Sequence, residues 1–283
     1  MNEKDELINT NNKWCGVANL LIEKISKAIG YLYDPDGLIP ARRNFSSSLL
    51  QQITNNPDMN PIEKAALCNE ISFIIKKHKN QGEIIKLAAH LLDEQSKPEN
   101  IAEDWMFYFF EKIGNASTEM LKILWANILV HEANHPSSVS KRLIHNISIM
   151  SCQDAMDFIN LSVFCFYDKR YKNMAHPIIF VKDRMYDYKT FGITEEVLHK
   201  LQLFSLIETN YENGFVFHNA KRLLYTNHNI MLRSSLIPAG YVKLTDDGQI
   251  LLSVIEKKND NNALEFTLHM LSDKNVDVDC VSC

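Results

Sequence analysis

The sequence predicts a mainly α-helical protein with a smaller C-terminal region of mixed helices and strands. Two observations predict the helices: glycine (9) and proline (8) are scarce among the 283 residues, and apolar residues recur at three- and four-residue steps over much of the chain. A third observation is a change of period after about residue 176, where short apolar runs alternate with turn residues. At 46% hydrophobic and 23% charged residues, the chain can bury a core of ordinary size.

Composition excludes several classes of protein. The net charge of −5 disfavours a protein that coats nucleic acid by bulk electrostatics. The polar start of the chain does not resemble a signal peptide, and no apolar run is long enough to cross a bilayer. The six cysteines are mostly scattered within apolar patterns, which is typical of reduced thiols. We therefore expect a cytoplasmic protein without a cofactor.

Four segments are expected along the chain: a helical N-terminal region over 1–98, a central helical segment over 99–165, an α+β domain over 166–258 and a tail over 259–283. The tail ends in Cys280-Val281-Ser282-Cys283, a lone C-x-x-C without the second pair that a zinc site needs. We expect this end of the chain to be frayed.

The N-terminal region is predicted to contain three helices. Apolar residues form one face over Trp14–Tyr33, and Asn60-Pro61-Ile62-Glu63 supplies an N-cap, a proline at the first helical position and an acid at the third. The second helix is expected to end in the basic cluster Lys76–Lys79, and a third helix to span Gly82–Glu94. The Trp14–Tyr33 face could contact a membrane surface or a partner, but it carries only two lysines, so a core or oligomer face is favoured.

The central segment is predicted to hold four short helices. Asn100-x-x-Glu103 and Ser151-x-x-Asp154 are capping signals for the first and fourth, and Pro136 ends the second, which runs from Ser117 to about Asn134. Ser138 is expected to cap the third helix. Large side chains are expected to make this the folding core: Trp105, Phe109, Trp125 and Phe158.

The C-terminal region is predicted to combine strands with short helices. A strand is expected over Ile178–Val181 and a helix over Thr194–Phe204, followed by short strands at 206–208, 215–217 and 241–244. Residues 244–252 read L-T-x-x-G-x-x-L-L, and together these elements resemble the closing half of a winged-helix domain. The resemblance implies DNA binding, but the helix opens with Glu195-Glu196 and offers only His199 and Lys200 as basic groups. DNA binding is therefore disfavoured against contact with a protein.

The pentapeptide His131-Glu132-Ala133-Asn134-His135 matches the zincin pattern H-E-x-x-H. On a helix, two histidines four residues apart can bind one zinc ion while the glutamate activates its water. Pro136 places the second histidine at a fraying helix end, and no further histidine or glutamate follows at the required spacing. Histidines 131 and 135 are metal ligands only in this alternative interpretation, which we do not favour.

The segment Asp104–Phe158 resembles a family of bacterial proteins of unknown function that is loosely allied with abortive-infection (Abi-alpha-like) proteins. In that family Glu132 has a counterpart but the two histidines do not, and a glycine and a phenylalanine are usual where this chain has Ser137 and Val139. The opening piece Leu21–Pro35 resembles the family's first helix. The similar positions are Glu103-Asp104-Trp105, Glu119-Met120, Leu124-Trp125, Ile128-Leu129, Glu132, Pro136, Ser138, Ser140, Arg142-Leu143 and Asp154-Ala155. The resemblance implies a setting in phage defence or another response to mobile elements.

Three of these residues form a candidate polar cluster: Glu132, Ser140 and Arg142. They could line a binding pocket for a ligand or partner, or Glu132 could pair with Arg142 and join two consecutive helices. The structural interpretation is favoured, because no nucleophile–base pair or second carboxylate converges on them.

The sequence thus predicts a non-enzymatic interaction or effector protein that acts through self-association or a protein partner. A winged-helix DNA-binding regulator is the first alternative. A zinc-dependent hydrolase using the His131–His135 segment is the second.

Overall fold

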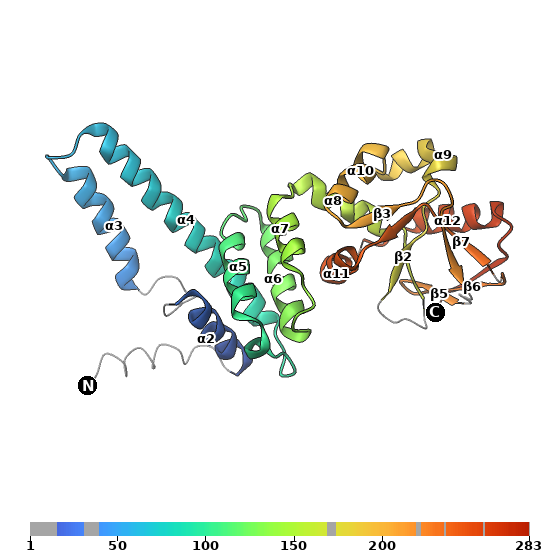
Figure 1. Cartoon of the computed structure of the whole chain (residues 1–283), viewed down its shortest axis with the longest axis horizontal. Coiled ribbons are helices and arrows are strands. Elements are labelled where there is room, and N and C mark those ends of the chain that lie inside the picture. Colours follow the sequence, from blue (N-terminus) through green and yellow to red (C-terminus); the bar gives the residue numbers. More distant parts are fainter. Residues whose placement is uncertain are drawn as a thin grey trace. The chain divides into compact units, whose positions relative to one another are not determined.

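The computed structural model describes residues 16–30, 40–168, 174–218, 222–234, 236–256 and 258–282 (Figure 1). The chain forms two compact units, residues 1–148 and 149–283. The expected boundary at 98 therefore falls inside the first unit. Each unit is described by itself below.

The first unit is helical throughout its described residues, as the sequence predicts (Figure 1). Its α-helices are α2 (Val17–Ile29), α3 (Pro40–Asn55), α4 (Pro61–Leu91), α5 (Glu103–Ile113), α6 (Glu119–Asn134) and α7 (Lys141–Ile149, whose last residue belongs to the second unit). A short 3-10 helix, η2 (Pro98–Asn100), precedes α5.

Helix α2 confirms the described part of the predicted N-terminal helix. Ala18, Leu21, Ile22 and Ile25 are buried, with Leu21 and Ile25 fully so, and the helix packs on α5 and η2. Its apolar face is thus part of the core of this unit. Trp14 and Tyr33 lie outside the described residues.

Helix α4 begins as predicted but continues beyond its predicted end. Asn60 caps it in a complete capping box with Glu63. The prediction of two helices, one ending at Lys76–Lys79 and another over Gly82–Glu94, is wrong, because one 31-residue helix runs through to Leu91. Between the two predicted helices, the amides of Asn80 and Gln81 are buried and donate to the carbonyls of Gly114 and Phe110, 2.9 and 2.8 Å away.

The two halves of α4 differ sharply in burial. Residues 61–79, which we call the outer half of α4, contain no buried side chain, whereas the inner half, from Asn80 to Leu91, includes the fully buried Ile84 and Ile85. Helix α6 packs against α4, and Lys122 of α6 pairs with Glu83 at 2.5 Å. Helix α3 also packs on α4, and the two run side by side in Figure 1.

The core of the first unit contains a stack of aromatic rings from α5 and α6. Trp105 stacks on Phe109 with 5.1 Å between ring centroids, and Phe109 meets the edge of Trp125 at 5.6 Å. Helix α5 starts after Ala102 and not at Asn100, because Asn100 closes η2. The cap of α6 is Thr118, one residue beyond the predicted start.

The second unit mixes helices with antiparallel strands. Its helices are α8 (Cys152–Ser162), α9 (Val181–Tyr188), η3 (Lys189–Phe191), α10 (Glu195–Leu203), α11 (Asp246–Val254) and α12 (Asn261–Asp273). Its strands are β1 (Cys165–Asp168), β2 (Ala175–Pro177), β3 (Ile207–Thr209), β4 (Phe215–His218), β5 (Arg222–Tyr225), β6 (His228–Leu232), β7 (Leu236–Gly240), β8 (Val242–Leu244) and β9 (Val278–Ser282). The capping box of Ser151 and Asp154 at the start of α8 confirms the predicted cap.

Six of these strands form three nested pairs. Strand β3 pairs with β8, β4 with β7, and β5 with β6, all antiparallel. The segment from Ile207 to Leu244 is therefore one long, interrupted hairpin, which explains why the predicted strand at 241–244 lies so far from its partner in sequence. The far end of the hairpin joins a five-stranded sheet of order β2-β1-β5-β6-β9, in which β5 and β6 lie between β1 and β9.

Two predictions for the second unit are wrong. A strand over Ile178–Val181 is not formed, because Ile179 makes only an isolated bridge to Gly240 and α9 begins at Val181. The segment 259–283 is not a tail, because α12 buries Leu264 and Leu271 in the core, and the described part of its end is not frayed, because β9 pairs with β6. The buried residues of α12 are three or four positions apart, but a polar run precedes them in the sequence.

Within the part of the chain that the structure describes, no helix combines the length and the apolar character needed to cross a membrane.

Candidate functional site

Glu132 lies in the last turn of α6 and binds the backbone of the loop that follows. We call residues 135–140 the Glu132 loop. The Glu132 side chain is 1% exposed, and its carboxylate accepts hydrogen bonds from the N–H groups of Ser137 (2.6 Å) and Val139 (2.9 Å). Burial raises the pKa of this carboxyl, and the hydrogen bonds from the loop partly oppose that rise. The carboxylate therefore holds the turn between α6 and α7.

The other face of the loop is held by Trp105. Its indole N–H donates to the Val139 carbonyl at 2.7 Å. Both backbone groups of Val139 are thus bound by side chains from other elements, and Val139 itself is 3% exposed. Ser137 has a φ of 68°, in the left-handed region that favours glycine.

The three residues of the candidate polar cluster have separate placements. Glu132 is turned into the loop, Ser140 is half-buried, and Arg142 is exposed in the first turn of α7. The Ser140 hydroxyl accepts the Leu143 N–H at 2.9 Å, so Ser140, not Ser138, caps α7. Ser138 instead places its hydroxyl 3.5 Å from the Glu132 carboxylate.

His131 and His135 lie close together at the end of α6, with 5.1 Å between ring centroids. Burial lowers the pKa of His131, and the charge of His135 lowers it further. Zinc sites use at least three protein ligands, yet within the described ranges no group of three or more His, Cys, Asp and Glu residues is placed to hold a metal ion. The glutamate of the pattern also faces loop N–H groups, so the residues present do not fit a zincin centre.

The core residues singled out in the sequence fall in both units. Trp105 is 5% exposed and Trp125 is 2% exposed, both in the first unit, while Phe158 is 1% exposed and belongs to the second. The sequence predicted that these residues share one core in the central segment, but Trp105 and Trp125 are buried in the first unit and Phe158 in the second.

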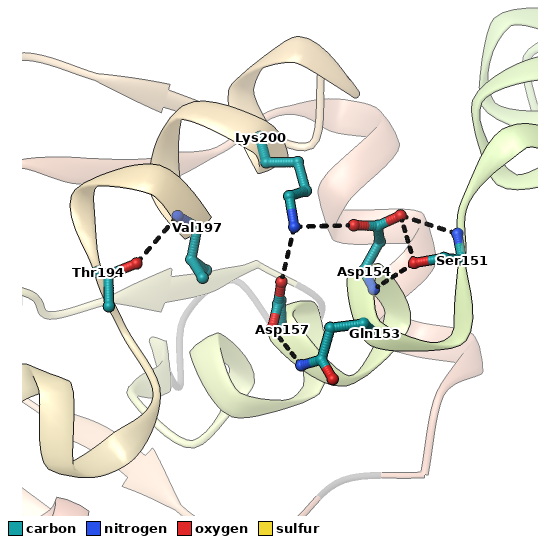
Figure 2. Close-up of polar contacts among 7 residues, drawn as sticks. All are labelled: Ser151, Gln153, Asp154, Asp157, Thr194, Val197 and Lys200. Carbon is teal, nitrogen blue, oxygen red and sulfur yellow. Dashed lines mark hydrogen bonds and ion pairs between the residues drawn. The ribbon is translucent and has the colours of Figure 1, made fainter.

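A charged cluster that the sequence analysis missed joins α8 to α10 in the second unit. Figure 2 shows Lys200 of α10 reaching between Asp154 and Asp157 of α8, with its Nζ 3.2 and 3.4 Å from their carboxylates. Both aspartates are buried, at 8% and 4% exposed. Gln153 donates to Asp157 at 2.8 Å, and Ser151 donates to Asp154 through its N–H and hydroxyl.

Opposing effects set the protonation of this cluster. Burial would raise the pKa of Asp154, but the hydrogen bonds from Ser151 and the ion pair with Lys200 together outweigh it, so the pKa lies below its ordinary value. The pKa of Lys200 is raised, chiefly by its hydrogen bond to Asp154. The Ser151–Asp154 cap was readable from the sequence, whereas the contact with Lys200, 43 residues beyond Asp157, had no local signal.

The L-T-x-x-G-x-x-L-L motif has a structural role at the start of α11. Thr245 caps α11 by accepting the Gly248 N–H, and its hydroxyl donates to the Ser205 carbonyl at 2.6 Å. A Cβ at Gly248 would lie 2.0 Å from the Leu206 carbonyl oxygen. Glycine is therefore required for α11 to pack this closely on the segment that follows α10.

These features define a mainly helical protein of two units whose most recognisable motifs serve its own fold. A family model described as "Protein of unknown function (DUF2806)" matches residues 72–267, well over half of the chain. The chain belongs to this family. No curated protein and no solved structure gives a significant match.

Proposed function

We propose that this protein is a non-enzymatic interaction or effector protein that acts through self-association or a protein partner. The observation that carries the proposal is the outer half of α4, where Ile62, Phe73 and Ile74 are 83%, 62% and 48% exposed. Large apolar side chains exposed along one helix are suited to contact with a partner. The polar groups of the Glu132 loop, by contrast, bind one another within the fold. The same is true of Lys200, Asp154 and Asp157, which we call the Lys200 cluster.

The setting that we propose is a bacterial response to phage or another mobile element. Its support is the resemblance of the segment Asp104–Phe158 to proteins loosely allied with abortive-infection proteins. The family description itself names no activity.

The experiment that tests this proposal combines phage challenge with native mass spectrometry. Bacteria that produce the protein are expected to show a lower plating efficiency for at least some phages than bacteria with an empty vector. The purified protein is expected to be a defined oligomer, or to copurify in fixed stoichiometry with one partner from infected cells. One zinc per chain, together with a hydrolytic activity lost in His131→Ala, would overturn the proposal.

A winged-helix regulator is the second candidate, and the arrangement around α10 is the observation that favours it. Helix α10 is capped by Thr194 and followed by the paired strands β3 and β8 and then by α11. Two features weigh against DNA contact: Lys200 is paired with two aspartates, and the far end of the hairpin lies between two other strands of a sheet. Fluorescence anisotropy at physiological salt with the DNA upstream of its own coding sequence is expected to show no sequence-specific binding.

A further inference from the structure

The outer half of α4 lacks the burial that normally stabilises a helix. Its 19 residues, 61–79, include none that is buried. Most helical stability in proteins comes from packing of an apolar face, and isolated helices of this length are marginal in water. Helix α3 packs along one side, where the Thr54 hydroxyl lies 3.9 Å from the Cys68 sulfur.

Its two most exposed apolar side chains, Ile62 and Phe73, lie on the side of the helix away from α3. At 3.6 residues per turn, Ile62, Ala66 and Phe73 share one face, which lies opposite Cys68 and Ile71. Cys68 and Ile71 are only partly exposed, as expected on the side covered by α3, whereas Ile62 and Phe73 are 83% and 62% exposed. Leu67, Ile74 and Ile75, at 37%, 48% and 38% exposed, lie on other sides of the helix.

Leaving this face in water forgoes a substantial stabilisation. Burial of large apolar side chains is the main favourable contribution to most protein association. The outer half is roughly 28 Å long at 1.5 Å per residue, which is long enough for a pair of such helices to form a stable contact. The face is therefore suited to a partner helix and not to a small ligand.

The charges on the outer half indicate which partner fits. Its first ten residues, 61–70, carry two acids, Glu63 and Glu70, and one lysine, whereas residues 71–79 carry three lysines and no acid. A twofold axis that pairs two such helices antiparallel places the acidic end of each beside the basic end of the other. Lys79 already lies 3.9 Å from Glu83 of its own helix, which leaves Lys76 and Lys77 as the lysines nearest the axis.

We propose that a second copy of this chain packs antiparallel on the outer half of α4, with Phe73 near the twofold axis. The apolar face supplies the free energy of association, and the separated charges set the antiparallel direction. This inference rests on the self-association in the proposed function and names the surface responsible for it.

Charge reversal gives a test in which two defective variants repair each other. Glu70→Lys makes the outer half basic throughout most of its length, and Lys76→Glu with Lys77→Glu makes it acidic. For each variant alone, the dissociation constant of the dimer is expected to be at least tenfold higher than that of the wild type, as measured by sedimentation velocity. An equimolar mixture of the two variants is expected to recover the wild-type dissociation constant. Glu63 is left unchanged because it belongs to the capping box of α4.

An apolar substitution with a matched control tests the same surface independently. Phe73→Asp is expected to be monomeric at concentrations where the wild type is a dimer. Phe107→Asp is the control, because Phe107 is a comparably exposed phenylalanine (47%) on α5 of the same unit. This control is expected to remain a dimer, and both variants are expected to retain the helical circular dichroism of the wild type.

The failures of this inference and of the proposed function are distinguishable. A wild-type oligomer that withstands Phe73→Asp and both charge reversals would overturn this surface while leaving self-association intact. A wild type that stays monomeric at about 100 μM, a concentration that populates even weak dimers, would overturn the second copy as the occupant. In that case, a lower stability of Phe73→Asp would indicate that another segment of the same chain covers this face. Copurification of a different protein would still support the proposed function.

Discussion

The Glu132 loop and the outer half of α4 belong to the same unit but use their side chains in opposite ways. The loop carries the most recognisable residues of the sequence, and they bind other groups of the same chain: Glu132 binds two loop N–H groups, and Trp105 binds the Val139 carbonyl. Beyond the capping box at its start, the outer half of α4 has no recognisable motif, and its most exposed apolar side chains face solvent. A memorable sequence pattern can thus mark a structural requirement, while the surface that we propose for association has no motif beyond a helix cap.

The strongest test of this comparison is the removal of Glu132. Glu132→Ala leaves the Ser137 and Val139 N–H groups without their carboxylate partner, and an unsatisfied buried group costs roughly 1–3 kcal/mol. Of these two residues, Val139 is buried and Ser137 is exposed. We therefore expect a loss of about 2–3 kcal/mol in the free energy of unfolding, measured by urea titration. Hydrogen exchange at both amides should become faster.

Glu111→Ala, at an exposed position on α5, is the control for this prediction and should change stability by less than about 0.5 kcal/mol. If Glu132→Ala instead kept full stability but abolished protection against phage, Glu132 would be a functional residue and the comparison would fail.

In the second unit, the charged groups of the Lys200 cluster also bind one another within the fold. Asp154→Asn weakens the ion pair and the α8 cap, and should cost about 1 kcal/mol at pH 7. The pKa of Asp154 is lowered in the folded state, so its contribution is present above its unfolded-state pKa, ordinarily 3.8, and is lost as pH falls through the folded-state value.

The stability difference between wild type and Asp154→Asn should therefore shrink as the pH falls from 7 to about 3. Urea titrations at several pH values measure this difference. Asp246→Asn, at an exposed aspartate, should change stability by less than about 0.5 kcal/mol across the same range. A difference for Asp154→Asn that grows on acidification would contradict the assignment.

A smaller effect of opposite sign is expected at Ser137. Its φ of 68° is strained for a residue with a side chain, so Ser137→Gly should relieve about 1–2 kcal/mol of strain while losing about 0.5–1 kcal/mol through the greater freedom of the unfolded chain. We expect a net gain of roughly 0.5 kcal/mol, read as a higher midpoint in urea.

Ser138→Gly is the matched control for Ser137→Gly, because Ser138 has no positive φ and its hydroxyl lies near Glu132. It should destabilise the protein. Equal effects of the two substitutions would show that the backbone conformation at Ser137 is not the limiting feature of the loop.

Local signals in the sequence predicted local structure well and long-range structure poorly. The caps at Asn60 and Ser151 and the helix after Thr194 were readable because each depends on residues three or four apart. The continuation of α4 through residues 80 and 81 could not be predicted in this way, because the hydrogen bonds from Asn80 and Gln81 go to residues 34 and 29 positions away. The sequence did single out Glu132, but its shortest hydrogen bonds come from backbone N–H groups, which leave no mark in a pattern of side chains.

The smallest expected effect on folding is at the outer half of α4, where it also distinguishes association from packing. Phe73 is 62% exposed, so Phe73→Asp should change the stability of the dilute protein by less than about 0.5 kcal/mol. Binding of a second copy stabilises the folded state by mass action, so the melting temperature of the wild type should rise with protein concentration. The melting temperature of Phe73→Asp should not rise, because its face no longer favours a partner. Differential scanning calorimetry over a hundredfold range of concentration measures both slopes, and parallel slopes would place the contact between copies elsewhere on the molecule.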